Sequence, residues 1–84
     1  MTTQEETYKD LEEFTKKMVE VMDISKDKYG DFTKCHPTEF LEHLGEEVDE
    51  VIKDISRGRL DEGSEEAIDV ANIAFMIWWK CKKK

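Results

Sequence analysis

Apolar side chains recur at helical spacing along three stretches of this chain, with charged side chains between them. In residues 4–28 the apolar positions recur every three or four residues, which predicts an amphipathic helix. Residues 40–55 wind into an apolar arc about 120° wide with a charged far side. The predicted core positions are Tyr8, Leu11, Phe14, Thr15, Met18, Val21, Met22 and Ser25 in the first stretch and Phe40, Leu41, Leu44, Val48, Val51, Ile52 and Ile55 in the second.

The third stretch, residues 65–81, is apolar nearly all round, which is typical of a buried helix. Helix-end signals separate the three stretches. Gly30 suits the end of the first helix, and Pro37 suits the first turn of the second, with His36 as its N-cap. Gly58 and Gly63 bracket a loop, after which Ser64 is a good N-cap for the third helix.

No alternating strand pattern and no internal repeat competes with this interpretation. We therefore predict one all-α domain over residues 1–84, with three helices of which the second and third form an antiparallel hairpin. Trp78 and Trp79 point about 100° apart on the third helix, and a short three-helix chain has little interior in which to bury both. We expect dimerisation to complete a four-helix core, in a homodimer or a dimer of dimers.

The chain carries a net charge of −8, and 40% of its residues are charged. This charge disfavours binding to nucleic acid polymers and anionic membranes. The first 20 residues are polar and charged, unlike a signal peptide, and the apolar third helix is too short and too acidic for a membrane span. We expect a cytoplasmic protein. Cys35 and Cys81 show no metal-binding spacing, so we interpret them as reduced thiols.

Two pairs of carboxylates lie at the margins of the apolar faces. His43, Glu47, Glu50 and Asp54 form a stripe along one edge of the arc on the second helix. Glu47 and Glu50 are three residues apart, so they share one helical face.

Glu66 and Asp69 repeat that three-residue spacing on the third helix, where they lie among apolar side chains. Burying an unpaired carboxylate costs roughly several kcal/mol of folding free energy. A hard divalent cation, which takes oxygen ligands, would compensate this cost. The alternative is that the acids form solvated faces.

The acidic pattern resembles the signature of the all-α nucleoside triphosphate pyrophosphohydrolases, which include MazG and the dimeric dUTPases. The matching run is Glu46-Glu47-x-x-Glu50, fifteen intervening residues and then Glu66-x-x-Asp69. The wider stretch from Tyr29-Gly30-Asp31 to Asp69-Val70-Ala71-Asn72 is most similar to small MazG-like proteins.

The resemblance implies hydrolysis of a nucleoside triphosphate between the α and β phosphates, which yields a monophosphate and pyrophosphate. It implies that Glu47, Glu50, Glu66 and Asp69 hold Mg²⁺, with Mn²⁺ as the alternative ion. Glu46 would be a secondary or water-orienting residue, which makes Glu46, Glu47 and Glu50 the expected catalytic set. Winding places Glu46 toward solvent.

Expected substrate contacts come from basic and amide side chains near the motif. Asn72 would hydrogen-bond the sugar or base, unless it makes an ordinary polar contact on the helix surface. The candidates for phosphate contacts are Lys53, Arg57, Arg59 and Lys80.

Besides an inactive relative that binds nucleotides or metal without turnover, two other functions remain open. The run Leu44-Gly45-Glu46-Glu47 also resembles phosphoribosyl-ATP pyrophosphohydrolase, although His43 stands where that family commonly has Lys. The other alternative is a non-catalytic helical interaction module in which Trp78 and Trp79 contact a partner. The chain is short for the family, and we expect the fourth helix found in many members to be missing, which leaves the base pocket and the preferred substrate open.

Overall fold

The computed structural model describes residues 3–29 and 32–82. For residues 25–29 it describes the backbone alone. The described chain is helical, as predicted, with three α-helices: α1 (Gln4–Tyr29), α2 (Glu39–Ser56) and α3 (Leu60–Lys82). A short 3₁₀ helix, η1 (Phe32–Lys34), lies between α1 and α2. In the described residues no helix is long and apolar enough to cross a membrane.

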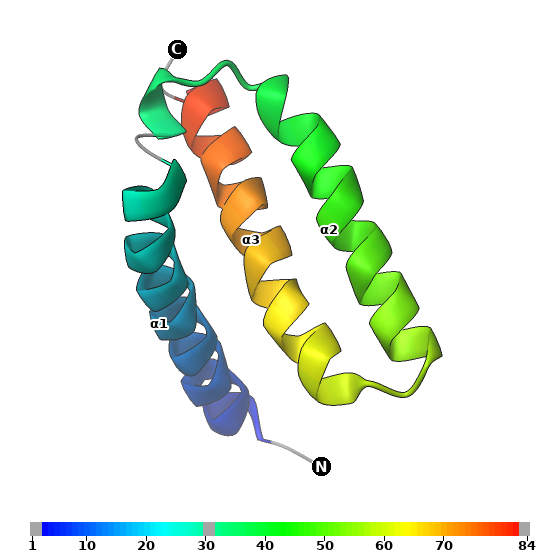
Figure 1. The fold of residues 1–84 in the computed structure, drawn as a ribbon. Coiled ribbons are helices and arrows are strands. Elements are labelled where there is room, and N and C mark those ends of the chain that lie inside the picture. The colour runs from blue at the N-terminus through cyan, green and yellow to red at the C-terminus, as the bar shows by residue number, and fades with distance from the viewer. Residues whose placement is uncertain (1–2, 30–31, 83–84) are drawn as a thin grey trace.

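Helix α3 lies in the middle of the molecule, with α1 on one side and α2 on the other (Figure 1). Helices α2 and α3 pack against each other extensively, and α1 packs mainly against α3. The 3₁₀ helix η1 lies at the C-terminal end of α3, where the Phe32 ring packs edge-on against Trp79 at 5.5 Å. The middle position of α3 explains why its sequence is apolar on nearly every side.

The predicted N-cap of α3 at Ser64 is wrong, because the helix begins before that residue, at Leu60. The chain turns at residues 57–59, where Gly58 adopts a left-handed φ of 74° and the Arg59 amide donates to the Asp54 carbonyl at 2.8 Å. Gly63, predicted to end a loop, lies inside the helix against α2. A Cβ there would come within 2.6 Å of Ile55 Cδ1, so glycine permits close packing at this point.

The start of α2 also differs from the prediction. The helix begins at Glu39 with Thr38 as N-cap, so His36 is not the N-cap and Pro37 precedes the first turn. His36 still stabilises this end, because its backbone amide donates to Glu39 Oε2 at 2.7 Å and its Nδ1 lies 2.8 Å from Thr38 Oγ1. The predicted helix end at Gly30 lies outside the described residues.

Only part of the predicted apolar arc of α2 is covered within one chain. Phe40 is buried, and Leu44 and Val51 are half-buried. The other members of the arc are exposed, so their assignment to the core of a single chain is wrong. These exposed positions are Leu41, Val48, Ile52 and Ile55.

Helix α3 packs on α2 over one edge of the arc rather than over its centre. The less exposed positions of α2 follow one stripe at helical spacing, Phe40, Leu44, Glu47, Val51 and Asp54. Two of these five positions are acidic. The packing of α3 therefore brings carboxylates of α2 into the α2–α3 interface.

Candidate metal centre

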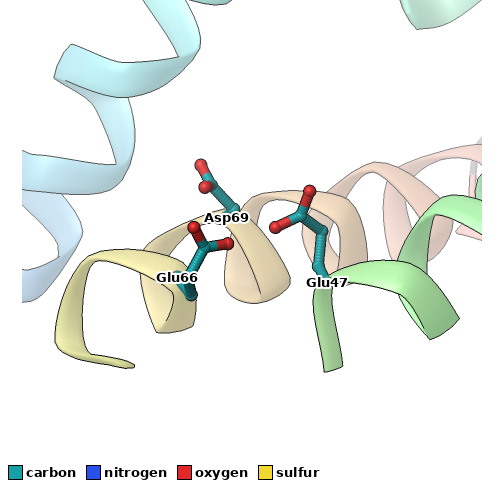
Figure 2. Close-up of side chains that lie close together, drawn as sticks. All are labelled: Glu47, Glu66 and Asp69. Carbon is teal, nitrogen blue, oxygen red and sulfur yellow. The ribbon is translucent and has the colours of Figure 1, made fainter. Parts of the chain in front are cut away.

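Three carboxylates from two helices converge on one side of the α2–α3 interface. Glu47 reaches across from α2, and Glu66 and Asp69 project from α3 one turn apart (Figure 2). Each offers an oxygen atom, and these three atoms lie within 4.8 Å of one another. All three side chains are half-buried. The structure thus brings together three of the four predicted metal ligands.

The crowding of these groups changes their proton affinity. The pKa of Glu66 rises from its ordinary 4.5 to about 7 because its carboxyl shares a hydrogen bond with Glu47, is partly desolvated and faces the negative charges of Glu47, Glu50 and Asp54. Burial raises the pKa of Asp69, and the charges of Glu66 and Glu65 add to that effect. The crowding of the three carboxylates therefore favours binding of a proton or of a positive ion at this place.

Glu50 and Glu46, the other predicted catalytic acids, lie outside this group. Glu50 is exposed, yet its charge contributes to the raised pKa of Glu66, so it lies at the margin of the cluster. Glu46 is exposed on the far side of α2, where its Oε2 lies 3.7 Å from His43 Nδ1. The solvent-facing position that winding predicts for Glu46 is confirmed.

The basic side chains expected to contact phosphate are dispersed. Arg59 Nη2 pairs with Asp54 Oδ1 at 3.2 Å. Lys80 Nζ donates to the Thr33 carbonyl at 2.6 Å and lies eleven residues beyond Asp69, about 16 Å along α3. Lys53 and Arg57 are exposed near the end of α2. Arg59 and Lys80 thus have structural roles within the chain.

Asn72 makes a polar contact within the chain, as its alternative interpretation expects, but this contact is buried and does not lie on the helix surface. The side chain is 4% exposed, and its Nδ2 donates to the Met18 carbonyl of α1 at 3.1 Å. It lies one turn beyond Asp69 on α3. A single amide in an otherwise apolar segment was the sequence signal for this position.

The ion pair between Asp54 and Arg59 is a feature that sequence reasoning missed. The sequence predicts Asp54 in the edge stripe of α2 with no partner for it, and it makes Arg59 a candidate for a phosphate contact. The Asp54 side chain is 10% exposed, and the pair closes the turn between α2 and α3. Gly58 was the available signal, since a left-handed residue there lets the chain fold back so that Arg59 reaches Asp54.

Chemically, the cluster provides oxygen donors from two helices in a partly desolvated setting. Carboxylate oxygens are the ligands that Mg²⁺ and other hard divalent cations take in proteins. A cation would replace the shared proton and remove the repulsion among Glu47, Glu66 and Asp69. The donor set therefore fits such an ion.

No protein-family model, curated protein or solved structure matches this chain. The site is therefore argued from its own residues. The MazG-like resemblance stays a prediction based on the acidic motif.

Proposed function

We propose that this chain is a Mg²⁺-dependent nucleoside triphosphate pyrophosphohydrolase of the MazG-like type. The observation that supports the proposal is the convergence of Glu47, Glu66 and Asp69 within 4.8 Å, from two helices and half-buried. An acidic protein repels a triphosphate, and a divalent cation between the two removes that repulsion. A cytoplasmic location, where nucleotides are plentiful, belongs to the same proposal.

We assign each acidic residue a role from its position in the cluster. Glu47, Glu66 and Asp69 would hold the ion, and Glu50 at the margin would orient or deprotonate the attacking water. When bound, Mg²⁺ neutralises charge on the phosphates and lowers the pKa of a coordinated water. The reaction cleaves the bond between the α and β phosphates. Hydroxide would attack the α phosphorus, and pyrophosphate would leave with the oxygen that bridges the α and β phosphates.

The proposed architecture includes a second copy of the chain. An antiparallel hairpin of α2 and α3 leaves Leu41, Val48, Ile52 and Ile55 exposed on α2. An apolar stripe of this kind is typical of a face that packs against another helix. Packing two such hairpins together would give the four-helix core and would cover the stripe.

The direct test is a screen of nucleoside and deoxynucleoside triphosphates for release of pyrophosphate and monophosphate with millimolar Mg²⁺. We expect hydrolysis of at least one triphosphate by the wild type. Asp69→Asn and Glu50→Gln should each lower kcat/KM by about a hundredfold or more. Asp61→Asn, an exposed acid in the first turn of α3, is the matched control and should retain activity.

The same screen separates the alternatives. If phosphoribosyl-ATP were hydrolysed faster than any other triphosphate, the first alternative would hold. The bond between the α and β phosphates would still be the one cleaved, and only the substrate would differ. A non-catalytic interaction module is the second candidate, because the exposed stripe of α2 and the 53% exposed Trp78 suit a partner protein as well as a second copy. Absence of pyrophosphate release from every triphosphate would contradict the proposed enzyme and favour this module.

A further inference from the structure

Only one of the two polar side-chain atoms of Asn72 has a hydrogen-bond partner among residues 3–29 and 32–82. Its Nδ2 donates to the Met18 carbonyl across the contact between α1 and α3. Its Oδ1 is buried and has no hydrogen-bond partner in the described part of the chain. A buried acceptor without a partner carries a free-energy cost, because it has lost its hydrogen bonds to water. An apolar residue would avoid that cost, so the amide calls for an explanation in function.

The orientation of this amide is fixed by its neighbour. The carbonyl oxygen of Met18 accepts hydrogen bonds and cannot donate one, so the NH₂ group of Asn72 must face it. The oxygen Oδ1 is then the atom that remains for a ligand. Any group that satisfies Oδ1 must be a hydrogen-bond donor.

The amide also lies next to the carboxylate cluster along one continuous strip of α3. Glu66, Asp69 and Asn72 are spaced three residues apart, so each lies about 60° round the helix from the last. The strip begins at α2, where Glu66 meets Glu47, and ends at α1, where Asn72 meets Met18. Asn72 is one turn, about 4.5 Å, beyond Asp69. In a nucleotide whose phosphates contact an ion at the cluster, the sugar, which is bonded to the α phosphate, would lie nearer to Asn72 than the base.

We infer that Asn72 is a specificity residue whose Oδ1 accepts a hydrogen bond from a sugar hydroxyl of the bound nucleoside triphosphate. The inference rests on the proposed function, and it names the part of the substrate that α3 recognises. Oδ1 is covered in the free chain, so the inference requires a local displacement at the α1–α3 contact that uncovers Oδ1 and keeps the hydrogen bond to Met18. Because α1 packs mainly against α3, that displacement disturbs one helix contact and leaves the α2–α3 interface in place.

The test measures kcat/KM for the triphosphate hydrolysed fastest by the wild type and for its 2′-deoxy and 3′-deoxy analogues. The wild type should prefer the substrate that carries the recognised hydroxyl by about tenfold or more, because its removal leaves Oδ1 unpaired in the complex. Asn72→Leu presents no acceptor and should reduce that preference to about onefold. Ser64→Ala, an exposed control on α3, should keep it.

Stability provides a second readout. Asn72→Leu removes both the Met18 hydrogen bond and the unpaired acceptor, so its melting temperature should match or exceed that of the wild type. Asn72→Ala, which lacks the amide without adding bulk, is the second variant for the preference measurement if Asn72→Leu does not fold.

The outcomes distinguish this inference from the proposed function. Equal hydrolysis of all hydroxyl analogues by the wild type would overturn the role of Asn72 and leave the enzyme assignment in place. If the folded Asn72 variants kept the wild-type preference for the hydroxyl-bearing substrate, the role of Asn72 would also be overturned and the enzyme assignment would stand. Failure of the wild type to hydrolyse any triphosphate would overturn both.

Discussion

Glu66 interacts with both other carboxylates of the cluster, and its proton affinity follows from these interactions. The hydrogen bond to Glu47 requires a proton on one of the two groups, and the neighbouring charges make loss of that proton unfavourable. The pair is therefore sensitive to pH near neutrality. A cation at the same place would remove this sensitivity, since it takes over the role of the proton.

The pH dependence of the metal-free protein has a definite sign. The pKa of Glu66 is about 7 in the folded chain and 4.5 as its ordinary value. A raised folded pKa means that ionisation of this group opposes folding, and the opposition grows as pH rises from 4.5 to about 7. The urea midpoint of the metal-free protein should accordingly be higher at about pH 5 than at about pH 7.5.

A matched pair of variants separates this effect from general charge repulsion in an acidic chain. Glu66→Gln removes the titrating group and should abolish most of the difference between the two midpoints. Glu62→Gln, an exposed acid in the first turn of the same helix, should leave the difference unchanged. An equal or lower wild-type midpoint at the acidic pH would contradict the proton-sharing arrangement.

The sequence was sufficient to predict which acids of α3 belong to the cluster and insufficient for those of α2. The three-residue spacing places Glu66 and Asp69 on one face whatever α3 packs against. On α2, the spacing places Glu47 and Glu50 on one edge, but the rotation at which α3 packs decides which of them enters the interface. That rotation depends on side-chain packing between the helices, for which helical periodicity provides no information.

At the scale of the elements, the turn between α2 and α3 determines how the cluster forms. Glu47 meets Glu66 only because the chain reverses within residues 57–59 and Gly63 lets the two helices approach closely. The sequence suggested a longer loop because Gly63 and Ser64 match a helix start. Their helical state follows from the tertiary contact with Ile55, which overrides the local preference.

The ion pair that closes this turn should contribute to stability. Arg59→Ala leaves the Asp54 carboxylate largely buried without its partner, so we expect a loss of about 1–2 kcal/mol, reduced from the value for a fully buried pair because Arg59 is half exposed. Chemical denaturation measures the loss. Arg57→Ala, an exposed basic residue in the same turn, is the control and should change stability by less than about 0.5 kcal/mol.

A double-mutant cycle assigns the loss to the pair. Asp54→Ala combined with Arg59→Ala should show a coupling energy of about 1 kcal/mol. Additive effects of the two substitutions would show that the ion pair does not stabilise the turn.

At the scale of the whole molecule, a single chain has a small core. Phe40 and Ile68 are the buried hydrophobic residues of the described chain, while ten large apolar side chains are exposed. A chain of 84 residues that covers so little apolar surface gains little stability from burial. The all-helical fold was predictable from periodicity, whereas the partial cover on α2 was not, because the apolar arc does not specify which helix covers it.

The exposed stripe of α2 predicts self-association. Light scattering should give a dimer or a larger assembly at micromolar concentration. Ile52→Glu places a charge on the stripe, where the side chain is 57% exposed in one chain, and should shift the protein to monomer because burial of an unpaired charge is costly. Lys53→Glu, the adjacent exposed residue on the charged side of α2, should leave the assembly intact. A monomeric wild type would contradict a four-helix core shared by two chains.

The central claim is that Glu47, Glu66 and Asp69 together hold a divalent cation. The most direct measurement is the melting temperature with and without millimolar Mg²⁺ for the wild type, Asp69→Asn and the control Asp61→Asn. Each kcal/mol by which bound Mg²⁺ stabilises the folded chain should raise the melting temperature of a chain this size by roughly 4–8 °C. We expect a rise in the wild type and in Asp61→Asn and none in Asp69→Asn. A wild-type melting temperature unchanged by Mg²⁺, or an equal rise in Asp69→Asn, would contradict the metal centre.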